Sequence, residues 1–510
     1  MTQVNEQLVR EMVEQVLQHV QTGWGGRTAP KSGTTAPAVV SVGPVTATTA
    51  PVPAKAAVVS AGAAPAPDQL GRYGQFNDVG QAVEAAKTAQ RALARRSLAQ
   101  REEICQIIRD VTTARANELG AMEYDETKIG HQPHKAEKLV IAARIATGVS
   151  GLKTRCFSGD HGITLEEAAP WGVIGVVTPV THSLPTLVVN SVNMIAAGNA
   201  LVCNPHPGGK QVAAYGAKLF NQAIHEKFGI DNLICVIVEP TLDSAKQIFE
   251  HPDIRLLTVT GGPGVVAAAL RSGKRAICAG PGNPPVVVDS SADIDNAARC
   301  IIEGASYDNN LFCTSEKETF AEAACFDALM DALQRAGAHR LSAQQMDQLA
   351  KICIEQPEKG HPHAARKFVG AEPYVLAREI GLTVPASCRL LYGPTDAMHP
   401  FVQAEQMMPV MPVVKCPSFE DACDAALQSE HGFGHTAVIH SRLVDHMTHF
   451  GKMINTTLFV KNGPSMAGNG VGGEGYTSYS IAGWTGEGVT TPMTFTRFRR
   501  CVMVDNLRIV

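Results

Sequence analysis

The 510-residue sequence lacks a membrane-spanning run, a secretory signal and a strong charge of either sign. No stretch approaches the ~18 consecutive apolar residues that a transmembrane helix needs. The N-terminus has no charged, apolar and small-residue regions in the order of a signal peptide. With 44 basic and 48 acidic residues the net charge is −4, which creates no field that would attract nucleic acid or an anionic membrane. We therefore expect neither membrane nor nucleic-acid partners.

Paired cysteines are also missing. The 13 cysteines are odd in number, scattered, and never spaced as C-x-x-C. In a chain of this length that pattern predicts reduced thiols in a cytosol-like compartment rather than a disulfide framework. The histidine pairs His131/His134 and His361/His363 each flank a proline, which disfavours two ligands on one helical face. The sequence predicts no metal site.

The first 68 residues divide into a helical pattern and a tether. Apolar residues recur at four-residue steps over residues 1–20, which predicts an amphipathic helix. Residues 21–68 are rich in Ala, Pro, Thr, Gly and Val with almost no charge, and we expect a flexible linker there. Such a helix either folds back on its own protein or docks into a groove on a partner, and the helix alone leaves both open. A tether of about 48 residues favours docking.

The remaining chain alternates between β-rich and helical segments. Residues 77–121 are Ala-rich with a helical pattern. Farther on, strands are predicted at 172–178, 199–202, 233–238 and 256–260, and helices at 186–197, 243–249 and 265–272. Nearly continuous Val and Ile strands alternating with helices are typical of a parallel sheet covered on both faces, a doubly wound α/β fold. Ligands of such folds bind at the carboxyl ends of strands. A second α/β unit is expected from about Pro284.

The segment T-G-G-P-G at 260–264 joins a predicted strand to a predicted helix. Glycines let the backbone approach a phosphate, and a helix start offers N–H groups and the positive end of the dipole. The segment has neither the G-x-G-x-x-G spacing nor the lysine of a P-loop, so nucleoside-triphosphate chemistry is not expected. The local sequence leaves a plain turn and a phosphate contact both open.

The segment S-Y-D-N-N-L-F-C-T-S-E-K-E-T-F at 306–320 contains the cysteine of greatest interest. Asp308, Asn309 and Asn310 predict a turn, and Thr and Ser after Cys313 are common first residues of a new element. A thiol near a helix N-terminus would have a lowered pKa and supply a thiolate. From these residues alone Cys313 is either a nucleophile or a buried small hydrophobic residue.

Ordered motifs over residues 69–510 resemble the aldehyde dehydrogenase superfamily, and in particular its CoA-acylating branch from propanediol- and ethanolamine-utilising bacterial microcompartments. The motifs are P-W-G-V-I-G-V-V-T-P at 170–179, A-A-G-N-A at 196–200, N-P-H-P at 204–207, T-G-G-P-G at 260–264, A-G-P-G-N-P-P at 279–285, D-N-N-L-F-C-T-S-E-K-E at 308–318, Q-M-M-P-V-M-P at 406–412, G-G-E-G-Y-T at 472–477 and T-G-E-G-V-T-T at 485–491. The N-terminal helix and linker are similar to the encapsulation peptides that tether such enzymes inside a protein shell.

The resemblance implies the aldehyde dehydrogenase fold with three components. A Rossmann-like, NAD(H)-binding domain would span 69–279, with an oligomerisation hairpin near 150–165. An α/β catalytic domain would span 280–480. Residues 481–510 would form a C-terminal β oligomerisation segment that pairs across subunits of a homo-oligomer, either a dimer or a tetramer. The alternation of apolar and polar residues in the tail predicts a strand independently.

The resemblance also implies the chemistry. Cys313 would attack a short-chain aldehyde, with propionaldehyde the expected substrate, and the thiohemiacetal would deliver hydride to NAD and leave a thioacyl-enzyme. A free thiol has a pKa of about 8.5, so we expect the site to lower the pKa of Cys313. Hydrolytic relatives carry a general-base glutamate where this chain has Cys278, 35 residues before the nucleophile. CoA is therefore the expected acyl acceptor, and the product is an acyl-CoA.

Site residues follow from the same resemblance. His182 stands where microcompartment relatives often have the Asn that donates to the oxyanion, and it either takes that role or lines the substrate pocket. Phe312, before Cys313, is larger than usual. Glu405 is expected at the nicotinamide ribose, with a solvent-exposed Glu as the alternative. The expected cofactor contacts are Thr178, Pro179, Asn204, Pro205, His206, Gly261, Gly262, Gly264 and Glu405.

The choice of cofactor and the surroundings are expectations of the same kind. Asn204 and Pro207 replace a lysine and a glutamate of hydrolytic relatives, which leaves NAD and NADP both open. NAD is preferred because the resemblance implies a redox loop closed by an alcohol dehydrogenase. CoA is expected to enter the channel that NADH leaves, sharing Asn204, His206 and the 261–264 loop. The enzyme would lie in a microcompartment lumen of the bacterial cytoplasm, docked to a shell protein through residues 1–20. The alternatives are a hydrolytic aldehyde dehydrogenase and a non-catalytic assembly protein.

Overall fold

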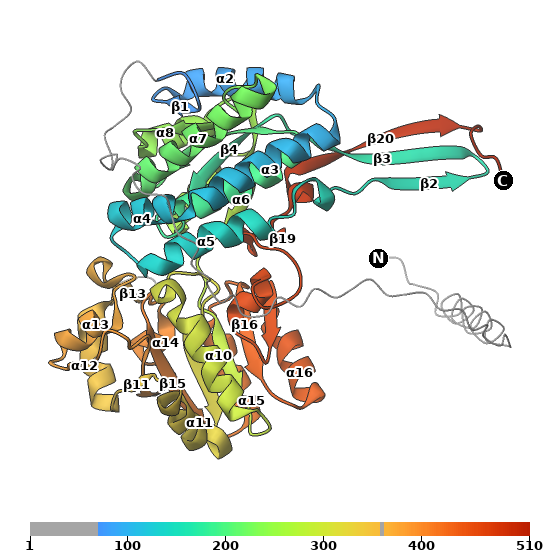
Figure 1. Cartoon of the computed structure of the whole chain (residues 1–510). Helices are drawn as coiled ribbons and strands as arrows, with labels where there is room; N and C mark the ends of the chain where they lie inside the picture. Colours follow the sequence, from blue (N-terminus) through green and yellow to red (C-terminus); the bar gives the residue numbers. More distant parts are fainter. Residues whose placement is uncertain (1–69, 358–361) are drawn as a thin grey trace, which may run out of the picture. The chain divides into compact units, whose positions relative to one another are not determined.

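The computed structural model describes residues 70–357 and 362–510. The predicted helix over residues 1–20 and the predicted linker over 21–68 lie outside the described residues. Within the described ranges, a pair of parallel sheets follow each other along the chain, and a small antiparallel sheet extends from the first of them (Figure 1). This arrangement confirms the predicted α/β class.

The first sheet is formed by Val- and Ile-rich strands that are parallel throughout. In spatial order its strands are β1 (Gln75–Phe76), β6 (Ile234–Ile237), β5 (Ala200–Pro205), β4 (Val173–Thr178), β7 (Ile254–Thr260) and β8 (Arg275–Ala279). The central strands β4 and β5 are buried along their whole length, because helices cover both faces of the sheet.

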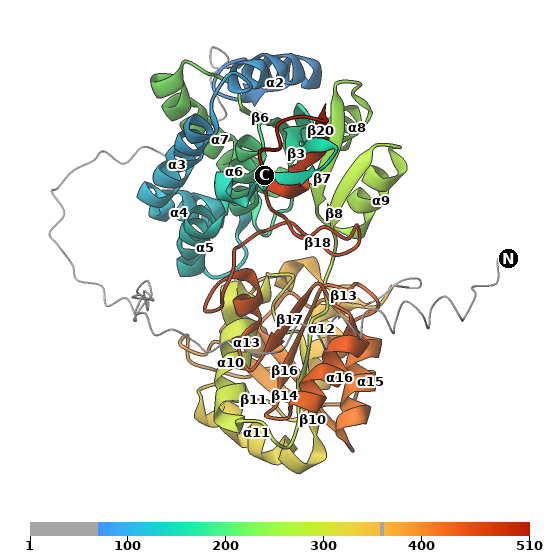
Figure 2. The same cartoon turned by 90° about the vertical axis from the view of Figure 1, so that its right-hand side faces the viewer.

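The helices of this first lobe divide between the two faces of the sheet. α6 and α7 lie on one face with α3, α4 and α5 beyond them, and α2, α8 and α9 lie on the other (Figure 2). The helices are α2 (Val79–Leu93), α3 (Leu98–Ala114), α4 (Ala116–Thr127), α5 (Gln132–Ile145), α6 (Ser183–Ala196), α7 (Lys210–Phe228), α8 (Leu242–Glu250) and α9 (Pro263–Arg271). The predicted strands and helices of this lobe are confirmed. The helix predicted from residue 186 begins three residues earlier, since Pro185 fits the first turn of a helix.

The second lobe contains a parallel sheet around β9. In spatial order its strands are β11 (His339–Arg340), β14 (Leu391–Thr395), β15 (Val410–Cys416), β10 (Glu318–Glu322), β9 (Pro285–Val288), β16 (Thr436–His440) and β17 (Leu458–Lys461). Its helices are α10 (Ile294–Ser306), α11 (Ala323–Arg335), α12 (Ala343–Cys353), α13 (Pro373–Glu379), α14 (Pro400–Gln403), α15 (Phe419–Ser429) and α16 (Val444–Ile454). α10 and α11 share one core with this sheet, and α15 and α16 share another. After β17 the chain returns to the first lobe, where Ser480 Oγ hydrogen-bonds Thr260 Oγ1 at 2.8 Å.

The third sheet projects from the first lobe as an arm (Figure 1). Its antiparallel strands are β2 (Arg155–Gly159), β3 (Gly162–Pro170) and β20 (Thr496–Val504). The strand predicted in the C-terminal tail is therefore present. Within the subunit its partner is β3, and pairing of this element across subunits stays a prediction. Apolar side chains remain exposed on the arm, among them Phe157, Phe498 and Val502.

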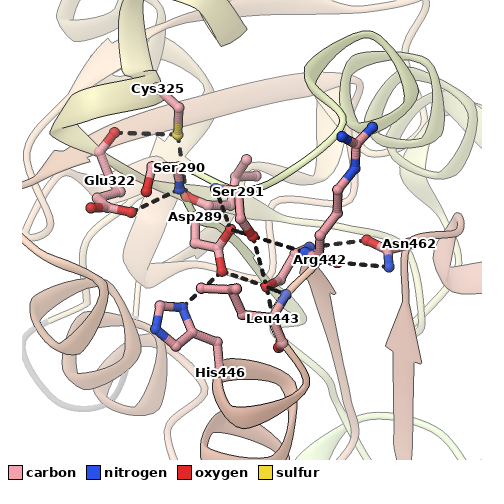
Figure 3. Close-up of polar contacts among 11 residues, drawn as sticks. Asp289, Ser290, Ser291, Glu322, Cys325, Arg442, Leu443, His446 and Asn462 are labelled. Atoms are coloured by element: carbon pink, nitrogen blue, oxygen red, sulfur yellow. Dashed lines mark hydrogen bonds and ion pairs between the residues drawn. The ribbon is translucent and has the colours of Figure 1, made fainter.

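A polar cluster around Asp289 closes the carboxyl ends of β9 and β16 (Figure 3). The buried carboxylate of Asp289 accepts hydrogen bonds from Ser291 N at 2.8 Å and from the hydroxyl groups of Ser291 and Ser441. His446 Nδ1 lies 2.8 Å from the same carboxylate. Burial raises the pKa of Asp289, but these hydrogen bonds outweigh burial and lower its pKa overall. The cluster ties the two loops that follow β9 and β16 together, at the end of the sheet opposite the turn that carries Cys313.

All 13 cysteines lie in the described ranges, and all are free thiols. Over residues 70–357 and 362–510 no three His, Cys, Asp or Glu side chains are close enough to hold a metal ion. No helix in those ranges is long and apolar enough to cross a membrane.

Candidate active site

Cys313 follows a left-handed turn that explains the sequence D-N-N. Asp308, Asn309 and Asn310 have φ angles of 47°, 53° and 65°, a region that Asp and Asn enter more readily than other residues with a Cβ. The turn is part of η4 (Tyr307–Asn310), directly after α10. The next regular element is β10, not a helix, so the thiol does not lie at a helix N-terminus.

Buried lysines hold this turn from both sides. Asp308 Oδ2 accepts hydrogen bonds from Lys138 Nζ at 2.6 Å and Lys135 Nζ at 3.1 Å, both on α5 of the first lobe. Lys317 Nζ donates to the main-chain oxygen of Asn310 at 2.9 Å, to its side-chain oxygen at 2.5 Å, and to Phe312 O at 3.1 Å. All three lysines are fully buried. The turn is therefore fixed at the junction of the two lobes.

The electrostatic surroundings of Cys313 differ from our expectation. Burial first, and the carboxylate of Glu405 second, raise the pKa of the Cys313 thiol to about 12. The cationic Lys317 and the backbone N–H groups of Cys313 and Thr314 act in the opposite direction and favour the thiolate. The expected lowering of the pKa was wrong because burial is invisible in the local sequence and outweighs these groups.

Glu405 lies beside the nucleophile rather than in solvent. Its Oε1 accepts a hydrogen bond from Gly282 N at 3.3 Å. Burial raises the pKa of Glu405, and the nearby Lys317 opposes that shift. The alternative of a solvent-exposed Glu is wrong. The structure brings Glu405 and Cys313 together, as a nicotinamide-ribose contact would require.

His182 immediately precedes α6. Its ring packs against that of Phe312 at an interplanar angle of 38° with centroids 4.2 Å apart, and its Nδ1 lies 3.0 Å from Lys138 Nζ. Burial and then the charge of Lys138 lower the pKa of His182 well below its ordinary value, so the ring is neutral. His182 thus lies next to the residue that precedes Cys313.

Gly282 offers a direct test of this packing. A Cβ at Gly282 would lie 2.6 Å from Cys313 O and 2.9 Å from the His435 ring, so Gly282→Ala must displace the main chain of the nucleophile. We expect kcat to fall at least ~10-fold, because small misplacements of reacting groups are costly. Gly280→Ala is the matched control, since its Cβ would meet nothing nearer than Trp484 at 3.7 Å. Steady-state kinetics of both variants measures the effect, and equal kcat values would contradict this packing.

The expected cofactor residues lie at the carboxyl ends of adjacent strands. Thr178 ends β4 and Pro179 follows it, while the 261–264 segment follows β7 and includes the first turn of α9, which begins at Pro263. β4 and β7 are neighbours from which the chain proceeds in opposite directions across the sheet, and this switch point is where doubly wound folds bind dinucleotides. A Cβ at Gly262 or Gly264 would meet no atom within 4 Å, so space for a phosphate exists in front of α9. These residues fit a dinucleotide.

Asn204, Pro205 and His206 end the adjacent strand β5 and follow it. The side chain of Asn204 is already engaged, because its Oδ1 accepts from Ser244 Oγ at 2.6 Å. His206 N donates to Thr178 O at 3.0 Å, and its Nδ1 accepts from Gly208 N at 3.0 Å. Asn204 and His206 therefore brace the loops at the end of the sheet, and the ring of His206 keeps Nε2 for other contacts.

Cys278 occupies a buried position on β8 and offers no carboxylate. Its main-chain N donates to Thr485 Oγ1 at 3.1 Å, and its side chain is fully buried in the core of the first lobe. Burial, with a smaller contribution from Glu487, raises the pKa of the Cys278 thiol to about 11. A thiol with so high a pKa is a poor general base for water at neutral pH.

Sequence reasoning missed the lysines of this site. Lys135 and Lys138 on α5 have the pattern of ordinary helical surface residues, and Lys138 is 170 residues from its partner Asp308. Lys317 belongs to a charged triplet of the kind that solvent usually surrounds, and its acceptors exist only once the left-handed turn has formed. A spacing of three residues puts Lys135 and Lys138 on one helical face, but that signal does not reveal burial.

Comparison with known proteins gives consistent results. Residues 71–489 match the aldehyde dehydrogenase family. The chain is 44% identical over 439 residues to the acetaldehyde dehydrogenase (acetylating) EutE of Salmonella typhimurium, covering 86% of this chain and 94% of that protein.

Two solved structures are also similar, each with a TM-score of 0.83, 42% identity, and coverage of 86% of this chain and 100% of the other. One is a propionaldehyde dehydrogenase from the fucose utilisation bacterial microcompartment of Clostridium phytofermentans. The other is the propionaldehyde dehydrogenase of Rhodopseudomonas palustris with bound CoA and an acylated cysteine.

Proposed function

The chain belongs to the aldehyde dehydrogenase family, and we propose that it oxidises a short aliphatic aldehyde, propionaldehyde in the first place, to the corresponding acyl-CoA. It is a CoA-acylating aldehyde dehydrogenase that uses NAD(P) and CoA. The observation that carries the substrate is the similarity to two propionaldehyde dehydrogenases, one of them acylated on cysteine and bound to CoA.

Cys313 is the proposed nucleophile. Its sulfur adds to the carbonyl carbon of the aldehyde, and the carbonyl electron pair moves to oxygen to give a thiohemiacetal anion. Lys317 and the backbone N–H groups of Cys313 and Thr314 favour the thiolate, which the buried site otherwise disfavours. The nicotinamide cofactor, when bound, supplies the hydride acceptor, and Cys313 is left carrying a thioacyl group.

The product depends on what is missing near the nucleophile. A carboxylate at position 278 would activate water and release a free acid, whereas the Cys278 thiol is buried and protonated. The thioacyl group on Cys313 should therefore persist until the CoA thiol attacks it. Exchange of one thioester for another forms one C–S bond and breaks one, so the bond energy is conserved in acyl-CoA.

For the cofactor we propose NAD, held by the loop 261–264, by Thr178 and Pro179 at the end of β4, and by Glu405 at the nicotinamide ribose. The open space at Gly262 and Gly264 supports the phosphate contact. CoA would reach Cys313 by the channel that NADH leaves, where it would share Asn204, His206 and the 261–264 loop, and Pro205 would be a further cofactor contact. Steady-state kinetics with NAD and with NADP tests the proposal of NAD, and equal kcat/KM values for the two cofactors would contradict it.

Residues 1–20 are proposed to dock the enzyme to a shell protein inside a microcompartment of the bacterial cytoplasm. The apolar stripe of those residues and the microcompartment origin of a similar structure support this. Deleting residues 1–20 should abolish co-purification with shells and leave the activity of the soluble enzyme unchanged. Loss of activity would show instead that the segment belongs to the catalytic structure.

We also propose that the enzyme is a homo-oligomer, a dimer or a tetramer, assembled through the arm of β2, β3 and β20. Phe157 is 54% exposed, Phe498 50% and Val502 55%, a concentration of apolar surface that usually marks an interface. Since these side chains are exposed within the subunit, Val502→Lys should lower the sedimenting mass without unfolding the subunit. An unchanged mass would contradict the assignment.

The test of the function is NADH formation from propionaldehyde with and without CoA. We expect sustained turnover only with CoA, and propionyl-CoA as the product by chromatography. Sustained turnover without CoA and with release of propionate would show a hydrolytic enzyme instead.

A further inference from the structure

Lys138 makes three polar contacts from a position that water does not reach. Its Nζ lies 3.2 Å from Thr181 O, 3.0 Å from His182 Nδ1 and 2.6 Å from Asp308 Oδ2. The side chain is fully buried. A lysine ammonium group has three N–H bonds and no acceptor, so these three neighbours use all of its protons.

This count fixes the tautomer of His182. Since the ammonium group can only donate, Nδ1 of His182 must accept and is therefore unprotonated. A neutral imidazole then carries its proton on Nε2. His182 Nε2 has no hydrogen-bond partner of good geometry, although the residue is only 4% exposed, and the main chain of Leu311 is close enough to raise the pKa of the ring. A buried donor without a partner is costly, so a free N–H here needs an explanation.

The ring of His182 faces the residue that precedes the nucleophile. Its centroid is 4.2 Å from that of Phe312 and 5.6 Å from that of Tyr479. An oxygen atom of an aldehyde, or of the acyl group on Cys313, is the acceptor that arrives at this place during the proposed reaction. Within that proposed function, we infer that Lys138 is a positioning residue that keeps His182 neutral with its proton on Nε2, ready to donate to the substrate oxygen.

The charges around the ring favour the same state. The ionisable and charged groups around His182 and Lys138 come from α4, α5, the turn at 308, the segment before β10 and the segment after β17: Glu123, Lys135, Asp308, Lys317 and Tyr479. Burial and the positive charges of Lys138, Lys135 and Lys317 lower the pKa of His182, with Lys138 the largest of the three. Burial lowers the pKa of Lys138 to about 8, and Asp308 opposes that loss of charge.

Asp308 connects Lys138 to the turn that carries the nucleophile. Its carboxylate accepts the hydrogen bond from Lys138, and its main chain is the first residue with a positive φ in the turn before Cys313. The orientation of the His182 ring and the position of the nucleophile are thereby fixed by one group.

The experiment is a double-mutant cycle of Lys138→Met and His182→Asn, in which NADH formation by the full-length enzyme is measured between pH 6 and 9.5. Without the ammonium group, His182 can place its proton on Nδ1 toward Asp308 and leave Nε2 bare. We expect kcat of Lys138→Met to fall by about 10- to 100-fold at pH 7, the size typical of a lost oxyanion donor. Burial keeps the imidazole neutral in this range, so acid does not restore the Nε2 proton and the deficit should persist as the pH falls.

His182→Asn is the background that isolates this mechanism. An Asn amide donates without help from a tautomer, so adding Lys138→Met to His182→Asn should change kcat by less than about 3-fold at every pH. The ratio of wild-type kcat to that of Lys138→Met should be largest while Lys138 is charged and should shrink above about pH 8, where the wild-type lysine loses its proton, whereas the ratio in the Asn background should stay flat. Equal losses in both backgrounds, or a pH-independent loss in the wild-type background, would show a merely structural lysine.

A second variant keeps the inference testable if Lys138→Met does not fold. Asp308→Asn retains a residue that tolerates the left-handed turn but removes the anion that keeps Lys138 protonated. The pH at which kcat declines on the alkaline side should then move to lower values than in the wild type, and an unmoved decline would overturn the inference. Turnover of the wild-type enzyme without CoA would refute the proposed function but not the inference about Lys138, because the double-mutant cycle measures only the formation of NADH.

Discussion

Cys313→Ala is expected to lose at least ~10⁴-fold in kcat, because no other group in the described site can form the thioacyl bond. Water cannot replace the sulfur as the nucleophile, since no general base stands at position 278 to activate it. Steady-state NADH formation with propionaldehyde and CoA measures the loss.

Cys278→Ala is the matched control for that substitution. Both residues are cysteines with raised thiol pKa values, about 12 for Cys313 and about 11 for Cys278, but only Cys313 is partly accessible. We expect Cys278→Ala to retain kcat within a few-fold of the wild type and to lose some thermal stability from the small cavity. Turnover by Cys313→Ala at a measurable fraction of that of Cys278→Ala would assign the chemistry to another group.

Lys317→Met should have the second largest effect, on stability and activity together. The substitution leaves the main-chain and side-chain oxygens of Asn310 without their donor in a buried turn, while Phe312 O keeps the hydrogen bond from Ser315 N. Each unsatisfied acceptor costs about 1–3 kcal/mol, so the loss should be at least ~2 kcal/mol. A cation that acts on Cys313 also disappears, which raises the thiol pKa further, and we expect kcat to fall at least ~100-fold.

Thermal unfolding and steady-state kinetics of the same preparation measure both effects. Lys351→Met is the control, because Lys351 is an exposed lysine of α12 far from the turn in sequence. It should match the wild type in both measurements. A Lys317→Met enzyme that is as stable and as active as this control would mean that the turn is held by other contacts.

The fold could be predicted from the sequence where apolar residues recur with the spacing of a strand or a helix. β4 differs from its predicted bounds by one residue, because a short run rich in Val and Ile between a glycine and a proline is typical of a buried strand. The strand in the tail was equally visible. The partner of this strand, β3, could not be predicted, because the alternation of apolar and polar residues indicates a strand but not which strand pairs with it.

The site was predictable only where family motifs mark it. The motif around Cys313 indicates the nucleophile, but nothing in it reveals that burial raises the thiol pKa instead of lowering it. Lys138 and Lys317 could not be found, since their acceptors are a carboxylate 170 residues away and two main-chain carbonyls of a left-handed turn. Long-range pairing and unusual backbone conformation are the two features that local patterns do not record.

The central claim is that Cys313 carries an acyl group that waits for CoA. It is tested most directly by mixing the enzyme rapidly with NAD and propionaldehyde in the absence of CoA. We predict a burst of one NADH per active site, no further turnover, and a propionyl group on the peptide that contains Cys313 by mass spectrometry. Continued NADH formation with release of propionate, or an unmodified Cys313 after the burst, would contradict the account.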